Sequence, residues 1–228
     1  MTTPTSQQHR IFTCLAAALF ALASVGAVSA DFTADCIYDG YVAMGGMVYN
    51  TSNSYLLPGN PDSPPQGSME TFGYAFLKFD DADLPAAAVD HAYLQLDVIC
   101  LQDGMTWPVQ GTGEVGAFAV TADVTTITGG TAGAFREHVA AVAADSISMT
   151  GEGLITLDVT EIVNDWIVSG DNYGLVLASP GGLMPRLHSS ESTAGIAPLI
   201  SSVPEPASVL LLGCAVVGLA SRRAGRSR

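Results

Sequence analysis

The chain has 228 residues, of which 48% are hydrophobic and only 13% are charged, and its net charge is −14. Five of its eight basic residues lie in the first 30 or the last 26 residues, so the segment 31–202 keeps three basic residues against 21 acidic ones, a net charge of −18. A surface of this charge repels nucleic acid and anionic lipid, which argues against a nucleic-acid partner. The segment itself has the length of one domain.

The first 30 residues have the pattern of a signal peptide. A polar stretch ending at Arg10 precedes an apolar run over 11–25, and small residues at 28–30 stand where a signal peptidase cuts. A lipoprotein signal at Cys14 is the competing interpretation, but the residues before it, Ile-Phe-Thr, are too bulky for such a site. We therefore predict a signal peptide over 1–30.

The segment 31–202 has the pattern of β-strands separated by turns. Turn residues punctuate short runs in which apolar and polar residues alternate. In the clearest run, 91–100, every second residue from Ala92 lies on one apolar face, while Tyr93 and Gln95 point the other way. We predict strands at 41–44, 74–79, 91–100, 115–120, 154–159, 173–178, 186–190 and 197–201.

One short helix is predicted after the strand at 154–159. Asp158 is placed to cap it, Glu161 to return the bond three residues later, and Gly170 to end it. Its apolar face comprises Ile162, Val163, Trp166 and Ile167. The alanine-rich stretch 132–145 fits either a short helix or a loop. The expected fold is therefore all-β with one short helix.

Two cysteines, Cys36 and Cys100, remain once the two ends of the chain are set aside. The strand pattern places Cys100 on the same apolar face as Ala92. In an oxidising compartment we predict a disulfide between the two cysteines, worth about 2–4 kcal/mol of stability. Two cysteines without CxxC spacing predict no zinc site.

Three carboxylates, Asp80, Asp81 and Asp83, follow the strand at 74–79. Their spacing suits a calcium ion whose shell is completed by backbone carbonyls, although acids in this density also mark an ordinary turn. No other cofactor is indicated. The acidic surface serves solubility outside the cell, or alternatively calcium binding or cation-bridged contact with an acidic polysaccharide.

Exposed aromatic side chains are candidates for carbohydrate contact, because their rings stack on the apolar face of a sugar. Trp107, in a loop beside Pro108, is the strongest candidate, and a cap over the end of the fold is its alternative role. Tyr93 and Gln95 share a strand face and extend a shallow platform, unless that face is solvated or covered. Trp166 belongs to the predicted core.

Motifs for catalysis are lacking. His91, His138 and His188 are scattered, with neither a nucleophile elbow nor a zinc-protease motif around them. Carboxylate pairs in so acidic a chain say nothing about glycoside hydrolysis. We therefore predict that the protein is not an enzyme.

The last 26 residues, 203–228, have three parts. Pro204, Glu205 and Pro206 form a stiff extended motif, an apolar run of 14 residues follows at 207–220, and four arginines come last. As a helix the run is about 21 Å long against a hydrocarbon core of about 30 Å, and the arginines hold its end in the cytoplasm. We interpret the run as a stop-transfer helix that is too short for a stable permanent anchor. The alternative interpretation is an ordinary C-terminal transmembrane anchor.

This order of parts resembles the PEP-CTERM sorting signal. The resemblance implies a bacterium with a diderm envelope, membrane insertion through the tail helix, and an exosortase-type processing enzyme as a partner. It implies delivery to the cell envelope, the surface or the extracellular matrix. The tail therefore predicts where the protein is delivered, and it predicts no activity.

A second resemblance covers nearly all of 31–202. It is carried by DGYV at 39–42, FLKFD at 76–80, AYLQL at 92–96, LDVTEIVNDW at 157–166, NYGLVL at 172–177, HSSE at 188–191 and PLI at 198–200. Together these resemble the DNRLRE-type domain, which is also grouped with family 96 carbohydrate-binding modules. The resemblance implies an antiparallel jelly-roll β-sandwich and polysaccharide binding. Residues 120–149 lack the tryptophan segment usual in that family.

The sequence thus supports three functions. The first is a surface or matrix protein that binds extracellular polysaccharide through Trp107, Tyr93 and Gln95. The second is a structural envelope or matrix protein without a dedicated ligand. The third, with the least support, is a small polysaccharide-active enzyme.

Overall fold

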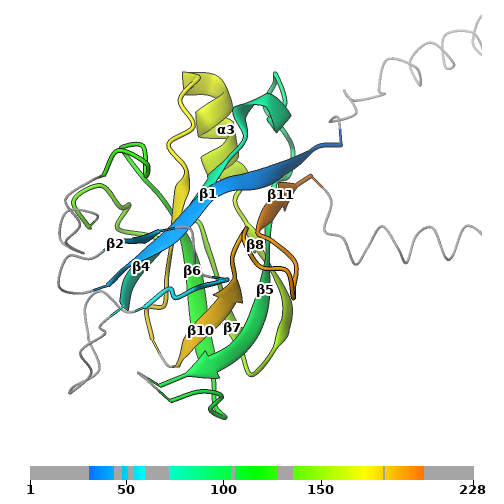
Figure 1. Ribbon diagram of the computed structural model, residues 1–228. Coiled ribbons are helices and arrows are strands. Elements are labelled where there is room, and N and C mark those ends of the chain that lie inside the picture. Colours follow the sequence, from blue (N-terminus) through cyan, green and yellow to red (C-terminus); the bar gives the residue numbers. More distant parts are fainter. Residues whose placement is uncertain are drawn as a thin grey trace, which may run out of the picture. The chain divides into compact units, whose positions relative to one another are not determined.

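The computed structural model describes residues 31–43, 48–50, 54–59, 72–103, 106–127, 136–181 and 183–202 (Figure 1). The predicted signal peptide, 1–30, and the predicted sorting segment, 203–228, lie outside these residues. Within the described ranges, no helix has the length and apolar character needed to cross a membrane.

The described chain is mostly β-strand with one α-helix and one 3-10 turn. The strands are β1 (Thr33–Ala43), β2 (Val48–Asn50), β3 (Tyr55–Leu56), β4 (Phe72–Phe79), β5 (Tyr93–Gln102), β6 (Gly113–Ala119), β7 (Asp145–Met149), β8 (Gly153–Asp158), β9 (Leu175–Ala178), β10 (Met184–His188) and β11 (Leu199–Ser201). The helix is α3 (Thr160–Ser169) and the 3-10 turn is η1 (Asp81–Asp83). The expectation of an all-β fold with one short helix is confirmed.

Strand β1 belongs to two sets of antiparallel strands (Figure 1). Its first residues pair with β11, which pairs with β5, and β5 also pairs with β8 and β10, while β3 pairs with β10. We call these strands the first set. The rest of β1 pairs with β2 and β4, and the order continues through β9 and β6 to β7, the second set.

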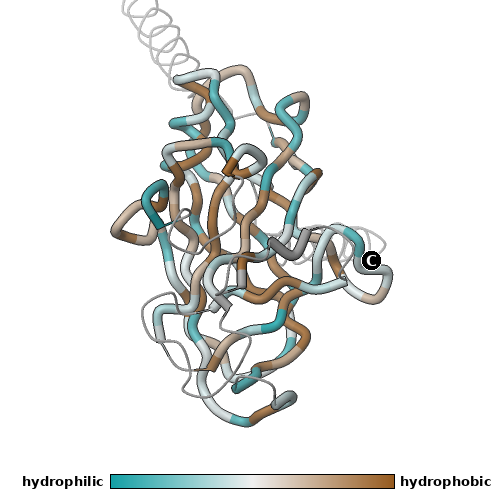
Figure 2. Tube along the Cα trace, turned by 60° about the vertical axis from the view of Figure 1, so that its left-hand side comes forward, coloured by the Kyte–Doolittle hydropathy of each residue, from teal (hydrophilic) through white to brown (hydrophobic). Residues whose placement is uncertain are grey.

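One core receives side chains from both sets. Leu94, Leu96, Leu157, Leu187 and Ile200 come from the first set, and Ala75, Leu77, Phe79, Ala117, Leu175 and Leu177 come from the second. Hydrophobic residues run along the central strands and hydrophilic residues along the surrounding loops (Figure 2). A smaller cluster, which includes Phe76, Val124 and Val176, packs a loop against the other face of the second set. Alternation along each strand thus decides which side chains enter the core.

Helix α3 packs its apolar face on that core. Ile162, Val163 and Trp166 are buried as predicted, and the Trp166 ring stacks on Phe79 at 6.3 Å between centroids. Gly170 ends the helix in the left-handed conformation, with φ of 77°. The N-cap residue is Val159 and not the predicted Asp158, although Asp158 still accepts the N–H of Thr160, the first residue of the helix. Among the described residues, the predicted return bond from Glu161 is not made.

Each of the eight predicted strands overlaps an observed one, while β2, β3, β7 and the first residues of β1 were not predicted. β2 and β3 are only three and two residues long, too short for a period to show. β7 reads Asp-Ser-Ile-Ser-Met and carries only two large apolar side chains, Ile147 and Met149. These short strands become visible only through their pairing partners.

Candidate functional site

The most distinctive surface feature is a stack of Tyr55, Arg186 and Trp107. The guanidinium carbon of Arg186 lies 3.7 Å from the Tyr55 ring centroid and 5.0 Å from the Trp107 ring centroid. Tyr41 continues the row, with its ring 6.3 Å from that of Tyr55. A cation held against two aromatic faces is stabilised by the quadrupoles of both rings. We call the first three residues the aromatic–arginine stack.

Three separate segments build this stack. β3 contributes Tyr55 and pairs with β10, which contributes Arg186. Trp107 comes from the loop after β5, where Asp103 and Thr106 exchange backbone hydrogen bonds of 3.0 Å. The stack therefore depends on the pairing of β3, β10 and β5, which lie far apart in the sequence.

The Arg186 side chain has no carboxylate partner and makes no hydrogen bond within the part of the chain that the structure describes, and its Nε is buried. By contrast, Lys78 forms an ion pair with Asp123. In a domain with a net charge of −18, a guanidinium that no acid neutralises is an attractive site for an anion.

The structure separates the predicted platform residues. Trp107 is 53% exposed and is available for contact. Tyr93 is half-buried and stacks on His91, whereas Gln95 is buried and its amide donates to Ser201 Oγ at 3.2 Å. Tyr93 pairs with Ser201, seven residues before the Cys100–Arg186 pair, so it lies roughly 23 Å along β5 from the stack. The three residues form no common face, because Trp107 lies beyond the other end of β5 and Gln95 is buried. The loop 189–197 also hydrogen-bonds Asp97, two residues after Gln95 on this strand.

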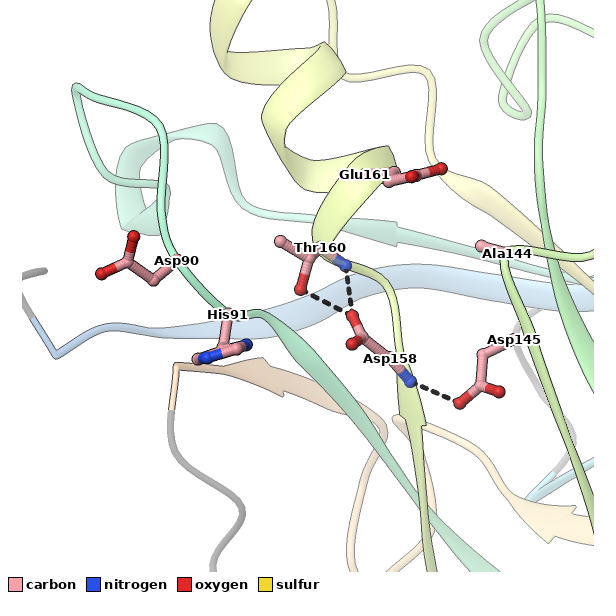
Figure 3. A pocket seen from close by; sticks show the side chains of 7 residues that line it. All are labelled: Asp90, His91, Ala144, Asp145, Asp158, Thr160 and Glu161. Atoms are coloured by element: carbon pink, nitrogen blue, oxygen red, sulfur yellow. Dashed lines mark hydrogen bonds between the residues drawn. The ribbon is translucent and has the colours of Figure 1, made fainter.

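An acidic pocket lies at the start of α3. It has a volume of about 610 Å³ and is lined by Asp90, His91, Ala144, Asp145, Asp158, Thr160 and Glu161 (Figure 3). Two of the four carboxylates already have structural partners. Asp158 accepts the Thr160 backbone N–H at 2.9 Å and its hydroxyl at 2.6 Å, while Asp145 accepts the Asp158 N–H at 2.9 Å. These bonds connect β7, β8 and the start of α3. Asp145 and Asp158 therefore have a structural role in holding these elements together.

The three aspartates predicted to bind calcium form the η1 turn. Asp80 caps it by accepting the Ala82 N–H at 2.9 Å, and Asp81 and Asp83 are exposed. Residues two apart in a 3-10 turn point in different directions around its axis. No group of three metal-ligating side chains is assembled anywhere in the described ranges. The structure thus shows a capped turn here, without a gathered set of calcium ligands.

The predicted disulfide is wrong, since Cys36 and Cys100 are both free. The pairing of β5 with β10 skips from Cys100 to Val98, so Ile99 forms a β-bulge and the alternation shifts. Leu101 enters the core, and Cys100 turns toward Arg186 on the outer side. Register also places Cys100 roughly 13 Å further along the sheet than Cys36 and two strands away, whereas a disulfide requires Cα atoms within about 7 Å.

A buried carboxyl group that sequence reasoning missed lies on β1. Asp39 is 1% exposed, and its Oδ2 accepts the Ser190 N–H at 2.7 Å, while Oδ1 has no hydrogen-bond donor among the described residues. Desolvation raises the pKa of Asp39 to about 6, and the nearby Glu191 carboxylate adds to the rise. The neighbouring Cys36 thiol also has a raised pKa, chiefly through burial. The one feature of the sequence that could have indicated this buried group is an Asp flanked by residues typical of a strand.

Ser192, His188 and Asp97 form a second polar group. The Ser192 hydroxyl lies 2.6 Å from His188 Nδ1, and Asp97 Oδ2 lies 3.8 Å from Nε2. Asp97 also accepts the Ile196 N–H at 3.0 Å, and Gly195 packs against the imidazole so closely that a Cβ there would clash with it. These contacts hold the loop 189–197 against β5 and β10.

Comparison with known proteins identifies the tail. The family model of the PEP-CTERM protein-sorting motif matches residues 202–224, which include Pro204, Glu205 and Pro206. No curated protein matches the chain. The motif indicates an exported protein at the cell surface of a Gram-negative bacterium, and it implies processing by an exosortase.

Proposed function

We propose that this exosortase-sorted surface protein binds an extracellular polysaccharide at the aromatic–arginine stack. On this proposal the two strand sets form a jelly-roll β-sandwich, and the domain acts as a binding module without catalytic activity. The observation that supports it is the guanidinium of Arg186, which lies between Tyr55 and the exposed Trp107 ring and has no acidic partner among the described residues.

The chemistry of the stack favours a polysaccharide that carries carboxylate or sulfate groups. The Trp107 ring offers a flat apolar face for a sugar ring, and the planar guanidinium can donate two parallel hydrogen bonds to a carboxylate. Because the rest of the domain is strongly acidic, non-specific binding of such a polymer is disfavoured. Binding would therefore depend on these few side chains.

The position of the stack suits a tethered protein. The sorting motif follows β11, whose Ser201 pairs with Tyr93 at the start of β5. Arg186 pairs with Cys100, seven residues further along β5, or roughly 23 Å away. The stack thus lies far from the point where the tail leaves the domain, and it remains accessible to a polymer when that tail is in the membrane.

A structural envelope or matrix protein is the second candidate. The net charge of −18 favours it, since an acidic domain can be bridged to acidic polymers by divalent cations without any dedicated site. In that case Arg186 and Trp107 would only cover one end of the core.

The test measures binding of residues 31–202 to a panel of acidic and neutral polysaccharides, with and without calcium. We expect saturable binding to an acidic polymer, weakened about tenfold or more by Trp107→Ala and by Arg186→Gln. Arg186→Lys keeps the charge but loses the planar fork, so it should restore only part of the affinity.

Two matched variants control for unrelated effects. Arg136→Gln makes the same charge change at an exposed position between β6 and β7, and Val168→Ala truncates another exposed apolar side chain, on α3, so both should bind like the parent. Equal weakening by Arg136→Gln and Arg186→Gln would show that only net charge matters. Absence of binding across the panel would leave the structural function.

A further inference from the structure

The two ends of the folded domain are hydrogen-bonded to each other. Thr33 of β1 pairs with Ser201 of β11. Beyond this pair, the Ser202 N–H donates to the Phe32 carbonyl at 3.2 Å, and the Phe32 N–H donates to Ser202 Oγ at 3.2 Å. Pairing therefore extends to Ser202, which is also the first residue of the matched sorting motif.

β11 is an inner strand and not an edge. Its three residues pair with Thr33–Asp35 on one side and with Tyr93–Gln95 on the other, so its backbone groups are engaged on both sides. Ile200 is fully buried in the main core, and Ser201 accepts the Gln95 amide. Removing β11 from the sheet breaks two ladders and exposes an isoleucine.

Very little chain separates this strand from the motif. Only Val203 lies between Ser202 and Pro204. A fully extended chain spans at most about 3.6 Å per residue, so the two residues from Ser202 to Pro204 can span no more than roughly 7 Å. An enzyme that binds the chain on the amino-terminal side of Pro204 in an extended form needs the backbone groups of 199–202. β1 and β5 already hold those groups, and one backbone cannot pair with three neighbours.

We propose that the exosortase processes a form of this protein in which β11 has left the sheet, so that pairing of β1 with β11 controls processing. Completion of the sheet then protects the motif, and processing competes with folding of the domain. This inference rests on the sorting motif and on the strand pairing, and it is independent of polysaccharide binding.

The test uses the full chain in a host whose exosortase can be induced. Thr33→Cys with Ser201→Cys, in a Cys36→Ser, Cys100→Ser background, places two cysteines directly opposite each other on antiparallel strands. The chain accumulates first without the enzyme, so that the new disulfide forms. Processing is then followed after induction by the change in electrophoretic mobility.

We expect the cross-linked chain to be processed at least tenfold more slowly than the Ser201→Cys single variant in the same background. A segment of eight Gly and Ser residues inserted between Ser201 and Ser202, which leaves the matched motif intact, should restore processing of the cross-linked chain. Ile200→Ala removes buried apolar contacts of β11, so the chain that carries this substitution alone should be processed faster than the parent. Parental rates for the cross-linked chain and for Ile200→Ala would overturn the proposal, as would slow processing that the insertion fails to relieve.

Discussion

Replacing Asp39 by asparagine is expected to raise the free energy of unfolding at pH 7.5 by up to about 3 kcal/mol. Burial raises the pKa of Asp39 from an ordinary value of 3.8 to about 6, so at neutral pH the folded state holds an ionised carboxylate in a poorly solvated place. A difference of about two pKa units corresponds to about 3 kcal/mol. Asparagine keeps an oxygen for the Ser190 N–H and adds a donor toward Glu191.

The parent protein should accordingly lose stability as the pH rises. Between pH 3.8 and about 6 the folded state binds the Asp39 proton more tightly than the unfolded state does. The stabilisation from this proton is therefore complete below pH 3.8 and lost as the pH rises through about 6. Urea unfolding of residues 31–202 at several pH values from 4 to 8 measures this slope, which Asp39→Asn should remove.

Asp35→Asn is the matched control for Asp39→Asn. Asp35 lies on the same strand but is exposed, so its replacement changes the net charge by the same amount without changing a buried group. We expect stability and pH dependence close to those of the parent. If both variants gain the same stability, the cause is the net charge of the domain and the burial of Asp39 has no part in it.

Replacing Gly174 by alanine is expected to cost about 2–5 kcal/mol of stability. Gly174 has a φ of +79°, and a Cβ built there would lie 2.5 Å from the Leu77 carbonyl oxygen and 2.8 Å from Val124 Cγ2. The strained backbone contributes about 1–2 kcal/mol and the overpacking about 1–3 kcal/mol. The clash opens the pairing of β4 with β9 near Leu77 and Leu175.

Gly170 supplies the control for this second prediction. Its φ of +77° is nearly the same, but among the described residues other than its chain neighbours no atom lies within 4 Å of the Cβ position. Gly170→Ala should therefore cost only the backbone contribution of about 1–2 kcal/mol. The difference between the two variants in urea unfolding measures the clash alone, and equal losses would contradict the role assigned to Leu77 and Val124.

Much of the fold can be predicted from short-range patterns. The alternation along 91–100, the apolar face around Trp166 and the terminating Gly170 each depend on residues a few positions apart. The tail is equally local, because its three parts follow one another directly in the chain. In each case neighbouring residues carry the physical cause, so the sequence displays it.

The candidate site could be predicted only in part. Trp107 is exposed, as its loop setting indicates, but Arg186 and Tyr55 were missed because they meet it only after β3, β10 and β5 pair. Gln95 was placed on an open face, whereas the loop 189–197 lies over that side of β5. No local pattern reports which distant segment covers a strand face.

Most strands, the single helix and the cellular location of this protein can be predicted from local patterns, since periodicity, turn residues and the sorting motif act over short distances. Tertiary structure decided the rest. The bulge at Ile99 separated Cys100 from the core, pairing isolated Asp39 from water, and β11 joined the two ends of the domain beside the sorting motif. Each depends on strand register, which is set by contacts between residues many positions apart.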